Sequence, residues 1–352
     1  MNRLNAIKKE NKKYNLIMCF AMTSLLIAFF VSFTCGRFSQ VSVSEVFCIL
    51  WDNIFGGIEK TWNNNAETVV MNLRLPRICA SMLIGSALAM SGAAYQALFG
   101  NPIASPDTLG VSNAASFGAV FGILLGLNAL SVKITAFAIG ICAILVVFSV
   151  AILLNKGRNL TVYLLLIGMI VSSIFSALLA ILKYVADPDD QLPQITYWLM
   201  GSMSKITSDD VIAYIVFFLV GSIPLYLLRW RMNLLSLTEA EVKSLGENTF
   251  LLRGITVFCA TLLTASATAM TGGISWVGLI IPHIVRYLVG TDFRKVLPLS
   301  GILGALFLLV MDNLSRTISA NELPISIFTS LIGAPIFFIV LFVNRRSMSN
   351  DN

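Results

Sequence analysis

Side chains that could bind a metal or act as nucleophiles are scarce in this sequence. His283 is the only histidine, and none of the six cysteines belongs to a CxxC pair. Several His, Cys or carboxylate ligands are needed to hold a transition metal, so we expect no metal site and no cofactor. The sequence also has no GxxxxGK[ST] loop and no legible Ser-His-Asp or Cys-His constellation. We therefore expect that the chain is not an enzyme by itself and that any ATP hydrolysis takes place on a partner.

The histidine and the cysteines have simpler interpretations. Four of the cysteines lie inside apolar runs, where a thiol behaves as a small hydrophobic group. A disulfide is conceivable only between Cys35 and Cys48. His283 follows Pro282 in the segment IPHIVR. Because a single imidazole cannot explain ligand selectivity, we expect it to have a structural or gating role.

Three arginines border apolar runs. Arg74 and Arg77 form the ends of the segment RLPR, and Arg316 follows Asp312 by four residues. An i, i+4 spacing lets Asp312 and Arg316 pair on one helix face. Arginines at the ends of apolar helices can also anchor in lipid headgroups, because the guanidinium group reaches the interface.

The composition shows what must position these groups. Of the 352 residues 57% are hydrophobic and only 12% are charged, whereas soluble domains have about 25% charged residues. Lipid must therefore contact much of the surface. The net charge of +6 is spread between apolar runs and does not indicate nucleic-acid binding. An apolar run of about 20 residues follows Lys13, which is longer than the apolar part of a signal peptide, so we interpret it as the first membrane span.

Runs long enough to cross a bilayer, about 20 residues, occur ten times. The expected fold is therefore an all-α polytopic membrane protein, a single transmembrane domain over residues 1–352. The third and eighth runs are the weakest, because one is rich in small residues and the other is short and contains Pro282. The ten predicted helices lie near 15–35, 76–99, 108–127, 131–154, 161–184, 210–228, 250–271, 276–290, 296–318 and 325–344.

The basic residues set the expected orientation. With both termini in the cytoplasm, sixteen of the 24 Lys and Arg residues fall on inside segments, as the positive-inside rule requires. The long segments 36–75 and 186–208 are then outside, and we expect them to be non-helical. The segment 229–248 is the main inside loop.

Two similar segments suggest an internal repeat. Ala89-Met90-Ser91-Gly92 precedes Pro102, and Ala269-Met270-Thr271-Gly272 precedes Pro282 with the same spacing. The two segments lie five helices apart, so the repeat would be inverted, as in many transporters. Pro102 belongs to the break Asn101–Ser105, which either serves dense helix packing or forms a gate on a translocation path. We favour the gate, with Met90, Ser91 and Gln96 lining the path.

A set of motifs in order along residues 74–345 resembles the FecCD-type permeases, the membrane subunits of ABC importers for iron chelates, haem and cobalamin. The matching segments are RLPR, SGAAYQALFGNPIASPDTLGVSNAASFG, LLLIG, YWLMGS, NLLSLTEAEVKSLGEN, GGISWVGLIIPHIVR and ELPISIFTSLIGAPIFFIVL. The resemblance implies ten helices with an inverted repeat and a paired permease, bound to two ATP-binding cassette ATPases and an extracellular binding protein.

The resemblance also implies roles for single residues. Arg74, Arg77 and Arg316 would receive carboxylates of the binding protein. The inside loop would form a coupling helix that sits on the ATPase, although the family usually has glycine where this chain has Thr238. The coupling residues would be Leu237, Glu239, Glu241, Lys243, Leu245 and Gly246.

The expected function is import of a ferric siderophore across the cell membrane by alternating access. Cobalamin and haem permeases share these motifs, so both remain alternatives. A secondary transporter driven by an ion gradient, or a membrane enzyme or scaffold, fits less well, because no acidic or histidine relay is legible in mid-membrane.

Overall fold

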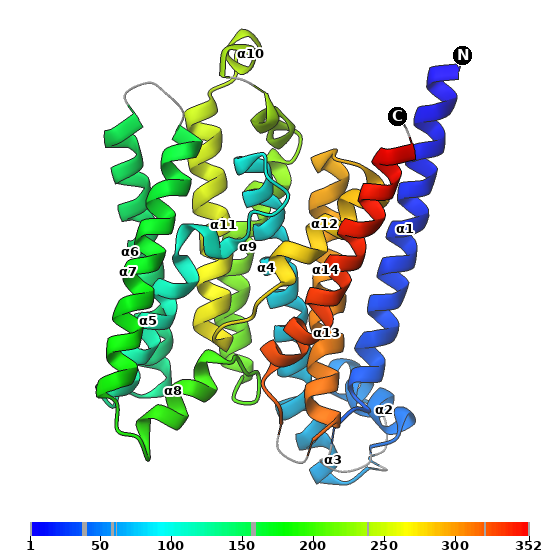
Figure 1. Ribbon diagram of the computed structural model, residues 1–352. Helices are drawn as coiled ribbons and strands as arrows, with labels where there is room; N and C mark the ends of the chain where they lie inside the picture. Colours follow the sequence, from blue (N-terminus) through cyan, green and yellow to red (C-terminus); the bar gives the residue numbers. More distant parts are fainter. Residues whose placement is uncertain are drawn as a thin grey trace.

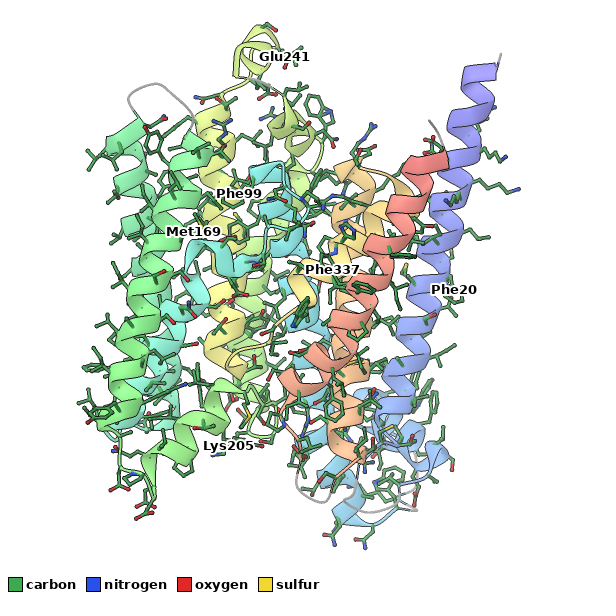
Figure 2. The ribbon with its side chains drawn as sticks, in the orientation of Figure 1. Phe20, Phe99, Met169, Lys205, Glu241 and Phe337 are labelled. Carbon is green, nitrogen blue, oxygen red and sulfur yellow. The ribbon has the colours of Figure 1, made fainter. Side chains whose placement is uncertain are left out.

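The computed structural model describes residues 2–36, 41–57, 60, 62–155, 160–237, 239–319 and 322–350. Side chains are described for these residues except 2–7, 54, 239–240, 243, 341 and 343–350. Every regular element within these ranges is a helix, which confirms the all-α fold class. The helices stand side by side as a bundle, and Phe20 projects outward from its edge with 75% of its surface exposed (Figures 1 and 2).

Seven helical segments are long and apolar enough to cross a membrane, and three shorter apolar helices accompany them. The ten predicted ranges correspond to these ten segments. The first span belongs to α1 (Asn2–Ser32), which starts well before the expected residue 15. The others are α4 (Leu75–Phe99), α5 (Val111–Leu124), α6 (Ala129–Asn155), α7 (Leu160–Val185), α9 (Ser208–Leu228), α11 (Thr249–Thr271), α12 (Val277–Val289), α13 (Phe293–Thr317) and α14 (Ile325–Asn350).

The prediction that residues 36–75 and 186–208 are non-helical is wrong. The first segment contains α2 (Val43–Phe55), α3 (Asn64–Thr68) and a π-helix (Val69–Arg74) that runs into α4, and the second contains α8 (Gln191–Leu199). These helices are too short to span a bilayer, so a search for long apolar runs does not find them. In α2 a local signal was present, because Ser42 and Glu45 form a capping box.

Both chain ends and the inside loop lie at one end of the bundle, and α2, α3 and α8 lie at the other (Figure 1). After the roles expected from the sequence we name them the coupling end and the outer end, and their orientation across the membrane stays a prediction. The labelled Glu241 sits at the tip of the coupling end, and Lys205 lies near the opposite end (Figure 2). At the coupling end the chain forms a 3-10 helix (Arg231–Ser236) and α10 (Glu239–Ser244).

The third and eighth apolar helices are the short ones, α5 with 14 residues and α12 with 13. Each follows a long helix that is largely buried, α4 with 25 residues and α11 with 23. α4 starts from the outer end and α11 from the coupling end, so the two long helices run in opposite directions (Figure 1). This arrangement agrees with an inverted repeat of five helices.

Small side chains let the helices approach closely. A Cβ atom added to Gly92 of α4 would overlap the backbone of Gly278 in α12, so the two helices meet where neither has a side chain. Hydroxyl groups add hydrogen bonds across the α4–α11 contact: Ser91 Oγ lies 2.8 Å from the Ala260 carbonyl oxygen, and the Tyr95 and Thr261 hydroxyls are 2.6 Å apart. The core therefore lies around α4.

Candidate functional site

The two interrupted regions of the repeat meet at one polar cavity. α4 ends at Phe99, its C-cap Gly100 has a left-handed φ of 58°, and the chain reaches α5 through a 3-10 turn, Pro106–Leu109. α11 ends at Thr271, and α12 starts after Trp276. The cavity between the two breaks has a volume of about 330 Å³ and is bounded by α4, α5, α7 and α11. Its lining includes Ser105, Asp107, Ser112, Asn113, Ser116, Lys183, Thr264, Thr268, Ser275 and Trp276.

Trp276 is the only non-glycine residue with positive φ among the described residues, at 75°. For a bulky side chain this backbone conformation is an outlier that costs on the order of 1–3 kcal/mol. Such strain persists only where the surroundings impose it. Here the ring of Trp276 lies 6.3 Å from that of Phe337 in α14, so α14 packs against the strained start of α12.

The predicted gate residues do not share one environment. Asn101 and Pro102 are exposed, and Asn101 Oδ1 accepts a hydrogen bond of 2.9 Å from the Ile103 amide. Ser105 is half-buried and lines the cavity. The break is thus a capped turn that leads from the surface of the subunit to the cavity. Its action as a gate stays a prediction.

Met90, Ser91 and Gln96 are buried inside the subunit. Ser91 is bonded to α11, and Gln96 Nε2 donates to the Leu279 carbonyl at 3.2 Å while its Oε1 accepts from Arg286. Met90 borders an apolar groove with residues of α1, α9 and α13. In this structure all three contribute to helix packing, and their predicted place on a translocation path stays a prediction.

The three predicted docking arginines form one buried network at the outer end. Each is at most 7% exposed. Arg77 Nε lies 2.9 Å from Asp312 Oδ1, and its Nη1 lies 2.7 Å from Glu322 Oε2. Arg316 Nε lies 3.2 Å from Asp312 Oδ2, which confirms the expected i, i+4 pair.

Arg74 and Arg316 also hold the end of α1. Arg74 Nη1 donates to the Phe33 carbonyl, and Arg316 Nη2 donates to the Ser32 carbonyl at 3.2 Å. The network therefore joins α1, α4 and α13 to the segment that precedes α14. Docking of a partner at these arginines stays a prediction, and Glu322 is the most exposed side chain of their ion pairs, at 33%.

The segment at the coupling end has both exposed and buried apolar side chains. Leu237 is 38% exposed and Leu245 is 61% exposed, whereas Val242 is 1% exposed. Glu241 is exposed and Gly246 has a φ of 76°, so it closes the turn after α10. Thr238 and the side chains of Glu239 and Lys243 lie outside the described part of the chain.

Asn233 ties this segment to the rest of the bundle. Its Nδ2 donates to Asp292 Oδ1 at 3.0 Å, and its Oδ1 accepts from the Phe293 amide at 2.9 Å. Asp292 is the N-cap of α13. Arg231 adds an ion pair of 3.2 Å with Glu247. Asn233 therefore links the segment 229–248 directly to the first turn of α13.

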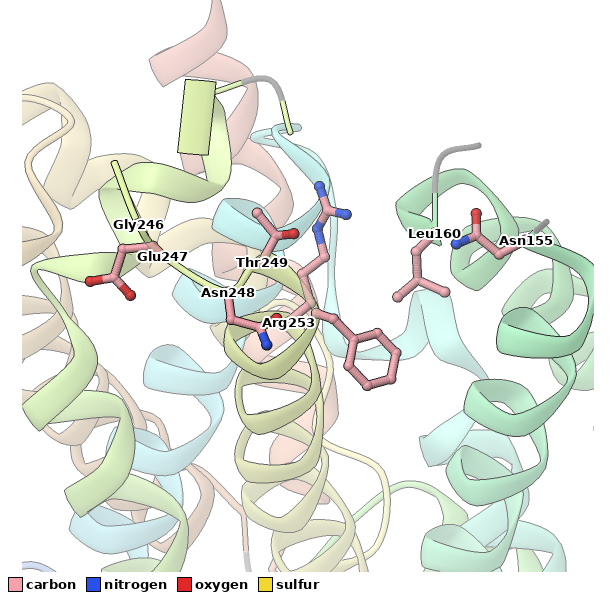
Figure 3. A pocket seen from close by; sticks show the side chains of 8 residues that line it. Asn155, Leu160, Gly246, Glu247, Asn248, Thr249 and Arg253 are labelled. Atoms are coloured by element: carbon pink, nitrogen blue, oxygen red, sulfur yellow. The ribbon is translucent and has the colours of Figure 1, made fainter. Parts of the chain in front are cut away.

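A pocket of about 480 Å³ lies beside the coupling segment (Figure 3). The ends of α6 and α7 form one wall, with Asn155 and Leu160. Residues from Gly246 to Arg253 form the other wall (Figure 3). The pocket separates the α6–α7 pair from the start of α11.

The lone histidine lies within α12 and is 7% exposed. Its ring contacts the Phe337 ring edge-on at 5.4 Å, and neither ring nitrogen has a hydrogen-bond partner among the described residues. Within the same ranges no group of three or more His, Cys, Asp or Glu side chains could hold a metal ion. Cys35 and Cys48 are free thiols. The structural or gating role of His283 stays a prediction.

Several residues of these sites had no predicted role. Glu322 stands in the ELPI segment but was given no role, and Asp107 follows the Ser-Pro of the break. The break between α4 and α5 can be seen in the sequence, and Asp107 is a carboxylate that lies within it. This position was the signal that could have marked Asp107 as a site residue. No local pattern pairs Arg77 with Asp312, which is 235 residues away.

Comparison with known proteins places the chain in a family. Residues 24–343 match the model of the FecCD transport family. The chain is 38% identical to the molybdate import system permease protein MolB of Haemophilus influenzae, over 94% of this chain and 97% of that protein. It is 35% identical to a probable iron chelatin transport system permease protein of Helicobacter pylori, over 84% of this chain and 90% of that protein.

A solved inward-facing structure of a metal-chelate type ABC transporter has the same fold. It superposes with a TM-score of 0.83 at 34% identity and covers 93% of this chain and 99% of the solved chain. The family model and these relatives span most of the chain and include both interrupted regions. The chain therefore belongs to the FecCD transport family, and it is a multi-pass membrane permease of the ABC importer type.

Proposed function

We propose that this permease carries an iron chelate, a ferric siderophore, into the cytoplasm. The observation that carries a transport role is the polar cavity at which the two interrupted regions meet. Irregular backbone inside a membrane bundle is tolerated where it lines a cavity, and inverted-repeat transporters place such breaks at their substrate path. The family membership supplies the ABC importer class, and the cargo is our proposal.

The charge of the cavity bears on the cargo. It is lined by one carboxylate, Asp107, and one ammonium group, Lys183, with seven hydroxyl or amide side chains between them. A site built for a small dianion would be lined mainly by cations and backbone amides. Mixed polar walls fit a cargo that is passed on without tight binding. The iron chelatin permease relative supports the same cargo class.

Molybdate is the second candidate, because the MolB relative is 38% identical over 94% of this chain. Cobalamin and haem remain alternatives within the same family.

The proposed assembly has a second permease subunit, two ATPases and an extracellular binding protein. The coupling end would face the cytoplasm, with both termini on that side, as the distribution of basic residues favours. Leu237, Glu241 and Leu245 would contact the ATPase, and Asn233 would pass its movement to α13. The binding protein would dock at the outer end around Glu322 and the arginine network. Alternating access would then open the Asn101–Ser105 break.

Uptake measurements test the cargo. Cells with and without the gene would be given radiolabelled iron as a ferric siderophore, labelled molybdate, labelled cobalamin and haem in parallel. We expect loss of the gene to abolish siderophore-iron uptake and leave the other three unchanged. Loss of molybdate uptake alone would contradict the iron proposal and establish the second candidate. A chain with Glu241→Arg serves as the matched control, because it should fold and insert but fail to import.

A further inference from the structure

Helix α2 carries an apolar stripe whose side chains each keep about half or more of their surface exposed. The stripe consists of four residues that follow one another at intervals of four, so they lie on one helix face. Val43, Phe47, Trp51 and Phe55 are 57%, 49%, 55% and 69% exposed. α2 has two carboxylates, Glu45 and Asp52, and one thiol, Cys48. None of the three belongs to the stripe. Glu45 is engaged in the capping box at the start of the helix.

The opposite face of α2 is fixed to the bundle. Val46 is 2% exposed and Ile49 is fully buried. They belong to a compact cluster that also includes Phe33, Trp62 and Val70. The helix therefore has a defined rotation, and the exposure of its aromatic stripe does not result from a loose segment.

The stripe continues the surface of α1. The Phe47 ring stacks on the Phe30 ring with centroids 4.8 Å apart and planes 16° apart. In the most apolar window of α1 only 11% of the residues are buried, and Leu26, Ile27 and Val31 are exposed. Such an apolar surface is suited to contact with lipid along its length. α2 lies beside the outer end of α1, where this lipid-facing surface ends (Figure 1).

We propose that α2 is an interfacial helix whose stripe of Val43, Phe47, Trp51 and Phe55 inserts into the bilayer near the lipid headgroups. Amphipathic helices that lie in this zone bury their apolar face about 5–10 Å into the boundary between headgroups and acyl chains. Tryptophan is enriched at that depth, because its ring is apolar and its indole N–H can still be hydrated. The stripe has the chemistry of a lipid contact along its whole length.

The position gives α2 a mechanical role. It is joined through the Phe33 cluster to the end of α1 that Arg74 and Arg316 hold. An anchor in the lipid interface would fix the depth of this arginine network in the membrane. The inference is independent of the cargo and of the ATPase, so it can fail while the transport proposal stands.

The experiment uses the full-length permease in nanodiscs of phosphatidylcholine. Lipids with bromine atoms close to the headgroup, lipids with bromine deep in the acyl chains and unbrominated lipids are compared. Bromine quenches tryptophan only at close range. The emission of Trp51 is obtained as the difference between the wild-type chain and Trp51→Phe, so the other four tryptophans remain in place. Trp62→Phe is the matched control, because Trp62 is 6% exposed within the same outer segment.

We expect the Trp51 emission to be quenched most by the bromine near the headgroup, less by the deep bromine, and little by aqueous iodide. The Trp62 emission should respond weakly to all three quenchers. Strong iodide quenching of Trp51 with no bromine effect would overturn the proposal and place the stripe in water. Bromine-insensitive emission that shifts to the blue only when the purified binding protein or a second permease copy is bound would overturn it too, in favour of a protein contact.

Discussion

Arg77 Nε lies 2.9 Å from Asp312 Oδ1, and this ion pair joins the start of α4 to the end of α13. The side chain of Asp312 is fully buried and that of Arg77 is 8% exposed. Glu322, in the segment before α14, is the second carboxylate partner of Arg77. Arg316 Nε forms an ion pair with the other oxygen of Asp312. Two helices and the segment before α14 thus meet at a network centred on a fully buried carboxylate.

Asp312→Asn should destabilise the permease strongly. Removing one partner of a buried ion pair leaves the other charge uncompensated, which costs about 3–5 kcal/mol. Here two guanidinium groups would lose a partner and only Glu322 would remain. Thermal unfolding of the purified permease in detergent measures the effect. Asp209→Asn, at an exposed carboxylate in the first turn of α9, is the control and should change stability little.

The close approach of α4 and α12 predicts opposite effects for two glycine substitutions. Gly92→Ala would place a methyl group on the backbone of Gly278, and overpacking of this kind costs about 1–3 kcal/mol or more. At Gly254 of α11 a Cβ atom meets only the Phe148 ring at 3.5 Å, an ordinary contact. Gly254→Ala should therefore stabilise the chain by about 0.5–1 kcal/mol through helix propensity. Equal melting temperatures for the two variants would contradict the close packing of α4 against α12.

The spans could be predicted from the sequence because each needs a long apolar run. The range predicted near 161–184 corresponds to α7, Leu160–Val185, and the short third and eighth helices were visible as the weakest runs. The breaks were visible as well, because Pro102 and Pro282 interrupt apolar sequence in similar surroundings. These features depend on local composition alone.

Other features depend on contacts between distant segments. The sequence marks Arg77 as a charged residue beside a span, but only the fold brings Asp312 and Glu322 to it. In the sequence Gly92 is one small residue among many, and only the fold brings Gly278 against it. The helix α2 was missed for a different reason. Its 13 residues are divided between an exposed apolar stripe and a buried face, and they are too few to form a span.

Substitution of Leu245 should separate coupling from folding. The side chain is 61% exposed at the coupling end, so Leu245→Ser should change the free energy of unfolding by less than about 0.5 kcal/mol. If the ATPase binds this surface, the variant should copurify with less ATPase and import less cargo. Leu130→Ser is the matched control, because Leu130 is 64% exposed at the start of α6. Equal ATPase recovery for both variants would rule out a contact at Leu245.

The N-cap of α13 predicts a pH dependence of stability. Burial by itself would raise the pKa of Asp292, but hydrogen bonds from Arg294 and Asn233 outweigh it and hold the pKa below its ordinary value. A carboxylate with a lowered pKa stabilises the fold above its unfolded-state pKa, about 3.9, and this stabilisation is lost as the pH falls through the folded-state value.

Asp292→Asn tests this dependence without removing the cap. Asparagine caps helices about as well as aspartate, so the Asn variant should lose the ion pair with Arg294 but keep most of the capping energy at neutral pH. Asp292→Ala should lose the cap too, at about 1 kcal/mol more. Melting temperatures would be measured in detergent between pH 7 and pH 3, and the slopes of melting temperature against pH would be compared among the three chains. Only a residue that titrates contributes to this slope, so the contribution of Asp292 is absent from both variants. The wild-type chain should lose more stability on acidification than either variant, and equal acid sensitivity in all three chains would mean that Asp292 is not the titrating group.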